Sequence, residues 1–179
     1  RLSPTLSSLP DFTYLGGSNY DGGMSVVFAG GSVYVYGTTY ANTGFPATLV
    51  TGTSNSGYEA YVAKFDSSLD SLTYAVQAGG SSTEPTFGWA YIETSPWYYQ
   101  INQNGLMVDP SGRAWVAGIT SSTTFPTTSG AYDTTHNGGY DGFVLAVNAS
   151  GSALEYSTFI GGSSTDALRA IGRAPDGRI

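Results

Sequence analysis

An internal repeat is the feature that most constrains what this chain can fold into. Three segments contain a Gly-Gly pair followed, four residues after the second glycine, by an acid: Gly16-Gly17 with Asp21, Gly79-Gly80 with Glu84, and Gly161-Gly162 with Asp166. The second glycines lie 63 and then 82 residues apart, so the period is about 63–65 residues and one copy carries an insertion of about 17. Such a period is typical of architectures in which each unit buries its faces against its neighbours.

Further motifs recur between these glycine pairs in an unchanged order. The segment 30–37 returns as 111–118, the pair Phe45-Pro46 as Phe125-Pro126, and the segment 57–63 as 139–145. The approximate units are therefore 12–74, 75–156 with an insertion near 85–103, and a truncated third unit at 157–179.

Each complete unit contains four strand-like runs separated by turn residues. In the first unit they are 24–28, 33–36, 58–65 and 72–76. Val, Tyr and Thr favour strands, and the 25 glycines supply turns. The run 33–36 is apolar or aromatic on both faces, which predicts a strand packed between neighbouring sheets, and Trp115 is expected in the core of the second unit. The sequence therefore predicts an all-β fold of four-stranded antiparallel sheets, arranged as blades of a β-propeller.

Four motifs resemble a known repeat family. They are Gly-Gly-Ser-x-x-Asp at 161–166, Asp-Pro-Ser-Gly-Arg-Ala-Trp-Val-Ala-Gly at 109–118, Phe-Pro-Thr-Thr at 125–128 and Gly-Tyr-Asp-Gly-Phe-Val at 139–144. Together they look like bacterial and archaeal seven-bladed β-propeller repeats, although Glu59 and Glu84 replace the usual Asp. The resemblance implies a propeller in a secreted or cell-surface protein, and it implies no particular reaction.

About two and a half blades are expected, and a closed propeller needs four to eight. The ends of this array therefore require neighbours. Those neighbours are either the remaining blades of a longer chain, which we favour, or other copies of the same chain that pool their blades into one ring.

Composition excludes several classes of partner. The net charge is −7, with only six Lys and Arg, so the chain has no basic patch for a nucleic-acid backbone. It contains no Cys and no apolar stretch that approaches the roughly 18–20 residues of a membrane span. Other copies of the chain, further blades or glycans are the expected partners, and no cofactor is expected except, as a weak alternative, Ca²⁺.

The insertion supplies the main candidates for a ligand or interface site. Its aromatic residues are Phe87, Trp89, Tyr91, Trp97, Tyr98 and Tyr99. Aromatic rings beside polar groups bind sugar faces and anchor protein interfaces. Local packing of the same rings against the sheets is the alternative interpretation.

Three other groups of residues are candidates for a chemical role. Asp21, Glu84 and Asp166 occupy equivalent positions, where they either cap their own turns or, less favourably, ligate Ca²⁺. His136, the only histidine, is expected in a solvated loop. Asn148 lies in a sequon, Asn-Ala-Ser, that permits glycosylation but is equally consistent with chance. No catalytic residue is predicted.

The sequence therefore favours a non-catalytic extracellular module with a structural or adhesive role in a surface layer, a filament or a large adhesin. A carbohydrate-binding propeller that uses the insertion aromatics is the alternative. A propeller that hydrolyses glycosides with a pair of carboxylates is a weaker one.

Overall fold

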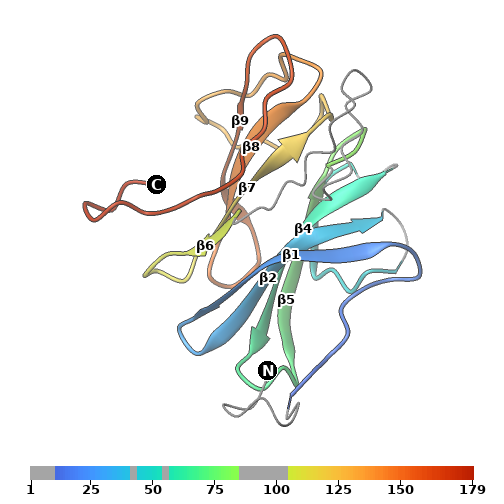
Figure 1. The fold of residues 1–179 in the computed structure, drawn as a ribbon, viewed down its shortest axis with the longest axis vertical. Coiled ribbons are helices and arrows are strands. Elements are labelled where there is room, and N and C mark those ends of the chain that lie inside the picture. Colours follow the sequence, from blue (N-terminus) through green and yellow to red (C-terminus); the bar gives the residue numbers. More distant parts are fainter. Residues whose placement is uncertain (1–10, 41–43, 54–56, 85–104) are drawn as a thin grey trace.

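A computed structural model describes residues 11–40, 44–53, 57–84 and 105–179. The described residues form nine β-strands and no helix, so the fold is all-β, as the sequence predicts. Within the same ranges, no helix is present that could cross a membrane. The strands form two separate sheets, one from each complete sequence unit (Figure 1).

The first sheet has the strand order β1-β2-β4-β5-β3. Its strands are β1 (Asp21–Ala29), β2 (Ser32–Tyr40), β3 (Leu49–Gly52), β4 (Tyr58–Asp66) and β5 (Leu72–Gly79). The pairs β1–β2, β2–β4 and β4–β5 are antiparallel, whereas β3 runs parallel to β5 at the edge of the sheet. The short strand β3 is an element that the sequence did not predict.

The second sheet repeats the antiparallel part of the first in the order β6-β7-β8-β9. Its strands are β6 (Leu106–Val108), β7 (Ala114–Thr120), β8 (Asp141–Val147) and β9 (Leu154–Ile160). Even an irregularity is repeated, because the pairing shifts between Lys64 and Phe65 in β4 and between Ala146 and Val147 in β8. The repeat seen in the sequence is therefore a repeat of strand order and register.

The Phe-Pro motif fixes the loop that precedes the edge of each sheet. The backbone N–H of Thr48 donates to the carbonyl of Ala75 at 2.7 Å, and the N–H of Thr128 donates to the carbonyl of Ser157 at 3.0 Å. In return, each threonine hydroxyl accepts a hydrogen bond from the N–H of the same partner. The two loops therefore dock on the last antiparallel strand in the same way.

Each sheet has two faces, which we call face A and face B. In the first sheet, face A carries Tyr34, Tyr36, Ala60, Val62, Tyr74, Val76 and Ala78, and face B carries Val26, Phe28, Val33, Val35, Tyr61, Ala63 and Phe65. The register places Trp115, Val144, Tyr156 and Ile160 on face A of the second sheet, and Leu106, Val108, Val116, Phe143, Leu145 and Phe159 on its face B.

The main core lies between the two sheets and joins unlike faces. It brings face A of the first sheet, through residues such as Tyr36 and Val62, against face B of the second sheet, through residues such as Val116 and Leu145. Face B of the first sheet holds a second, smaller apolar cluster around Tyr61 and Phe65. Strand β2 is therefore packed on both faces, as the alternation of Val and Tyr predicts.

Two details differ from the expectations or refine them. The sequence predicts Trp115 in the core, but it lies half-buried on face A of the second sheet, because its strand neighbours Ala114 and Val116 take the core side. The unit limits at 74 and 156 fall inside β5 and β9, so the sheets and the motif-based units are out of phase by a few residues.

Candidate functional site

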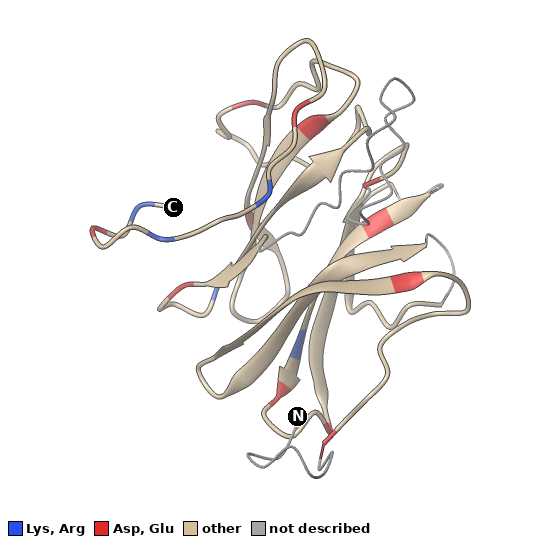
Figure 2. Cartoon of the chain, viewed as in Figure 1, with Lys and Arg blue, Asp and Glu red and all other residues tan. Residues whose placement is uncertain are grey.

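The repeated acids lie near the end of each sheet, where the chain leaves its last antiparallel strand. We call these places the acidic junctions. The first junction contains Glu59 at the start of β4 and Glu84 after β5. The second contains Asp141 at the start of β8 and Asp166 after β9. Most acidic residues lie at strand ends and in turns, and basic residues are few (Figure 2).

Backbone pairing builds both junctions in the same way. The N–H of Glu84 donates to the carbonyl of Tyr58 at 2.7 Å, and the N–H of Asp166 donates to the carbonyl of Tyr140 at 2.8 Å. Glu84 and Asp166 are thus each held beside the first residues of a third antiparallel strand, β4 or β8. The backbone pairing of the junction therefore recurs with the repeat.

The carboxylate that follows each Gly-Gly pair accepts a hydrogen bond from its own turn. Oδ2 of Asp21 accepts from the N–H of Gly17 at 2.8 Å, and Oδ2 of Asp166 accepts from the N–H of Gly162 at 2.8 Å. The backbone of Gly80 makes the corresponding hydrogen bond to Glu84. A short carboxylate that satisfies N–H groups in this manner stabilises a turn.

The acids of the strand starts are buried against glycine. Glu59 and Asp141 are both fully buried, and each lies where a side chain on the facing glycine, Gly79 or Gly161, would collide with it. Oδ2 of Asp141 also accepts a hydrogen bond from the N–H of Asn137 at 2.7 Å. The first glycine of each of these two Gly-Gly pairs therefore leaves room for the acid of the neighbouring strand.

Glu84 is the acid whose chemistry departs most from an ordinary carboxylate. Its side chain is fully buried, and Oε1 accepts a hydrogen bond from the hydroxyl of Thr120 at 2.8 Å. Burial raises the pKa of Glu84 from 4.5 to about 7, against the smaller opposing effect of hydrogen bonds from Ser122, Thr120 and Gly80. A carboxyl group with this pKa could act as a general acid, but a side chain with no exposed surface meets no substrate.

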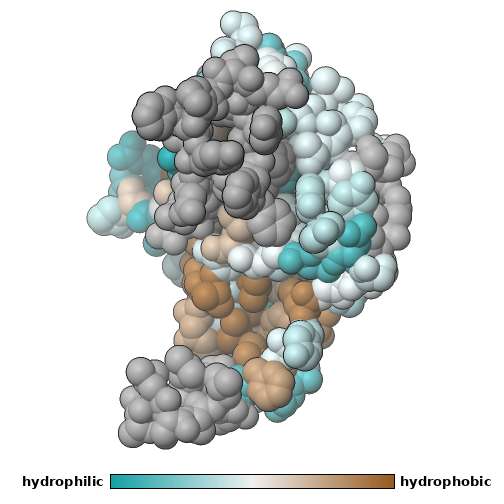
Figure 3. All heavy atoms as spheres, turned by 45° about the vertical axis from the view of Figure 1, so that its right-hand side comes forward, coloured by the Kyte–Doolittle hydropathy of each residue, from teal (hydrophilic) through white to brown (hydrophobic). Residues whose placement is uncertain are grey.

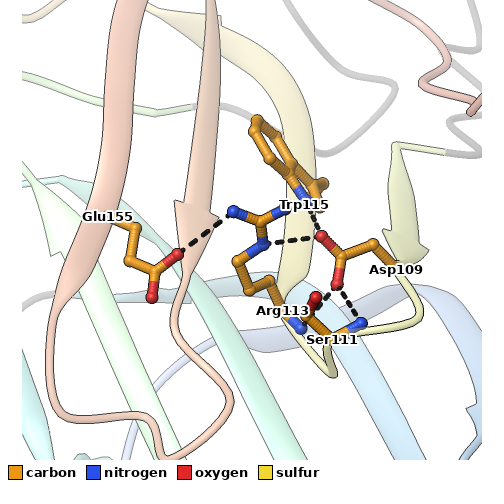
Figure 4. Close-up of polar contacts among 5 residues, drawn as sticks. All are labelled: Asp109, Ser111, Arg113, Trp115 and Glu155. Atoms are coloured by element: carbon orange, nitrogen blue, oxygen red, sulfur yellow. Dashed lines mark hydrogen bonds and ion pairs between the residues drawn. The ribbon is translucent and has the colours of Figure 1, made fainter. Parts of the chain in front are cut away.

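A second polar cluster lies at the turn between β6 and β7, and Figure 4 shows it. Asp109 accepts hydrogen bonds from Nε of Arg113 at 2.6 Å, from Nε1 of Trp115 at 3.0 Å and from the N–H of Ser111 at 2.9 Å. Burial alone would raise the pKa of Asp109, but the hydrogen bonds from Trp115 and Arg113 outweigh it and lower that pKa. Arg113 also reaches Glu155 at 3.4 Å.

The Asp109 cluster borders an open groove of about 510 Å³. The groove lies between the β1–β2 turn and the β6–β7 turn, and Arg173 lines a third side. Asp109, the only acid among the described residues that line the groove, already accepts hydrogen bonds from Arg113 and Trp115. The cluster therefore fits a turn-stabilising role better than a binding role.

The structure places the remaining predicted residues as follows. The insertion aromatics Phe87, Trp89, Tyr91, Trp97, Tyr98 and Tyr99 lie outside the described residues. The side chain of Asn148 stays within its own turn, where Nδ2 donates to Ser152 at 2.9 Å. His136 is half-buried with its ring edge-on to Phe159 at 5.7 Å between centroids, so it is not the fully solvated histidine that its loop suggested.

No metal centre forms in the part of the chain that the structure describes. There, no group of three or more His, Asp or Glu side chains is close enough to hold a metal ion. Asp21 and Asp166 each contribute an oxygen to their own turn instead, as described above.

Two residues of these clusters had no signal strong enough to single them out in advance. Thr120 is the last residue of β7 and its repeat equivalent Thr39 is the next-to-last residue of β2, so only the repetition marks them. Asp109 precedes Pro110 in an ordinary turn sequence, and its contact with Trp115 depends on the strand pairing.

Comparison with known proteins does not assign the chain to a family. No family model matches the chain, and no curated protein matches its sequence.

Proposed function

We propose that this chain is a non-catalytic structural or adhesive module of an extracellular assembly, such as a surface layer, a filament or a large adhesin, and that its sheets are blades of a β-propeller. One observation carries the proposal. The two sheets have the same strand order and pack through unlike faces, face A of the first against face B of the second. Propeller blades are stacked in this way around an axis.

The packing argues for a propeller over an ordinary sandwich. Two equivalent sheets related by a twofold axis would meet through the same face, and growth would end there. Unlike faces leave one face at each end that can accept a further unit. Face B of the two sheets carries equivalent aromatic contacts: Phe45–Tyr61, at 4.7 Å between centroids, and Phe125–Phe143, at 4.4 Å. Face B of the first sheet thus resembles the face B that is packed in the main core.

A structural role is supported by where the acids are used. Glu59, Glu84 and Asp141 are fully buried. Asp21 and Asp166 cap turns. Glycosidases need two carboxyl groups that face the substrate. Among the described residues, nothing specifically favours the carbohydrate-binding alternative, because its aromatic residues lie in 85–104.

The test has one measurement for location and one for architecture. Antibodies raised against the chain should label the outer surface of intact cells of the source organism, whereas labelling only after permeabilisation would contradict the proposal. Electron microscopy of the native protein should show a disc with radial blades. Particles built of two flat layers without radial order would contradict the propeller.

The carbohydrate alternative needs its own arm of the experiment. A glycan array probed with the purified chain should show no binding that Trp89→Ala or Trp97→Ala removes. Binding that either substitution abolishes would favour the lectin over the structural module.

A further inference from the structure

We infer that face B of the first sheet is a docking surface for face A of the second sheet in another copy of this chain, so that copies associate head to tail. The inference rests on the proposed function in one respect: it names the partner of the structural module. Face B of the first sheet carries an apolar cluster. Figure 3 shows a continuous hydrophobic area in the lower half of the molecule, where Figure 1 places the first sheet.

The first argument compares equivalent positions in the two sheets. The register aligns Val26 and Phe28 of β1 with Leu106 and Val108 of β6. Leu106 is 5% exposed because the first sheet covers it, whereas Val26 and Phe28 are 68% and 67% exposed. The β1 edge of face B is thus open in the first sheet, whereas its central residues Tyr61 and Phe65 are already buried, at 4% exposure or less.

The second argument is the complementary face at the opposite end. Face A of the second sheet carries Trp115, Val144, Tyr156 and Ile160, and their equivalents in the first sheet are Tyr34, Val62, Tyr74 and Ala78. All four equivalents are buried in the core, at 3% exposure or less. In contrast, Ile160 is 39% exposed and the other three are only partly buried. Each copy therefore has a partly open face A and a partly open face B, the same two kinds of face that already pack together between its own sheets.

The third argument is that each of the two faces carries a segment whose sequence repeats part of a complete unit. Segment 13–17 repeats the end of β9, and its Leu15 packs on face B of the first sheet, as the equivalent Ala78 packs within the main core. At the other end, segment 166–179 repeats the β1–β2 turn region, and its Leu168 lies against Gly142. Between them these segments cover part of each face.

A docking copy would replace these fragments with a complete sheet. Its residues 158–162 take the place of segment 13–17 of the receiving copy, and β1 of the receiving copy takes the place of segment 166–179. The contact is heterologous, since face A meets face B, so it builds rings or filaments rather than closed twofold dimers.

The experiment measures mass by sedimentation equilibrium of the full chain and its variants. The wild-type chain should give a concentration-dependent mass at least twofold above 18.6 kDa. Phe28→Asp blocks face B of the first sheet, and Ile160→Asp blocks face A of the second. Each variant alone should stay monomeric. Ser67→Asp, which adds the same charge in an exposed turn, should associate like the wild type.

Mixing the two blocked variants tests the head-to-tail arrangement. Each variant retains the face that the other lacks, so the mixture should form a 1:1 dimer that does not grow. Leu15→Ser should loosen the covering segment and strengthen association of the wild-type faces, although it makes the chain less hydrophobic. If Leu15→Ser weakens association, as Phe28→Asp is expected to, then segment 13–17 does not compete with a docking copy for face B, and the inference is contradicted.

Three results would overturn the inference. They are a wild-type chain that stays monomeric at every concentration, association that survives Phe28→Asp, and a mixture of the blocked variants that stays monomeric. Circular dichroism of each variant confirms that its strands have formed. Failure of the proposed function would appear as intracellular antibody labelling, which leaves these masses unchanged, so the two failures can be told apart.

Discussion

Thr120 donates its hydroxyl hydrogen bond to Oε1 of Glu84 across a distance of 2.8 Å, and both side chains are fully buried. This contact ties the second antiparallel strand of the second sheet to the residue that follows the first sheet. It places an ionisable group at the joint between the two sheets. The stability of the joint should therefore depend on pH.

Glu84→Gln should remove part of that dependence. The folded-state pKa of Glu84, about 7, lies above its ordinary value of 4.5, so between these values the native state keeps a proton that the unfolded chain releases. The contribution of Glu84 to the free energy of unfolding is fully present below pH 4.5 and falls by about 3 kcal/mol as the pH rises to 7. Urea unfolding across this range measures it. Glu155→Gln is the control, and an unchanged pH slope in Glu84→Gln would contradict the account.

Asp109→Asn should destabilise the turn between β6 and β7. The lowered pKa of Asp109 means that its contribution is present above the pKa of an unfolded aspartate and is lost as the pH falls through the folded value. At neutral pH we expect a loss of about 2 kcal/mol in the free energy of unfolding, because charged hydrogen bonds to Arg113 and Trp115 are weakened. Thermal melts at neutral and acidic pH should show the difference between variant and wild type narrowing in acid.

Gly118→Ala should disturb the packing between the sheets. A Cβ atom there would lie 2.5 Å from the ring of Phe143 and 2.5 Å from the hydroxyl of Tyr36, which belongs to the other sheet. Overpacking of this kind costs about 1–3 kcal/mol. Gly172→Ala is the matched control, since nothing lies within 4 Å of its Cβ position. Equal midpoints in urea for the two variants would refute the close contact.

The Gly-Gly turns should depend on their acids and not on a metal ion. Asp21→Ala and Asp166→Ala should each lower the free energy of unfolding by about 1 kcal/mol, because a carboxylate acceptor for Gly17 or Gly162 is lost. EDTA and added Ca²⁺ should leave the melting temperature of the wild type unchanged. A rise in melting temperature with Ca²⁺ that Asp21→Ala abolishes would support the ligation hypothesis instead.

The strands of both sheets could be predicted because apolar alternation, turn residues and repetition agreed. Strand β3 could not be predicted, because Leu49–Gly52 contains only two large apolar residues and is a strand only through its pairing with β5. The position of Trp115 was wrong for a related reason. Alternation shows which residues share a face, but it does not show which face a neighbouring sheet covers.

The junction chemistry was only partly visible in the sequence. Repetition marked Asp21, Glu84 and Asp166 as equivalent, and their turn contacts followed from the spacing to the glycines. The raised pKa of Glu84 was not predictable, because it depends on burial beneath residues of the second sheet that are distant in sequence, such as Thr120.

The most direct test of the packing between unlike faces is a disulfide between the two sheets. The hydroxyls of Thr53, just after β3, and Thr124, after β7, lie 3.4 Å apart on the surface, and the chain has no cysteine of its own. Under mild oxidation, Thr53→Cys combined with Thr124→Cys should form an intramolecular bond, seen as a mass loss of about two hydrogens and faster migration in a non-reducing gel. Two thiols that remain free in the folded protein would contradict the arrangement of the sheets.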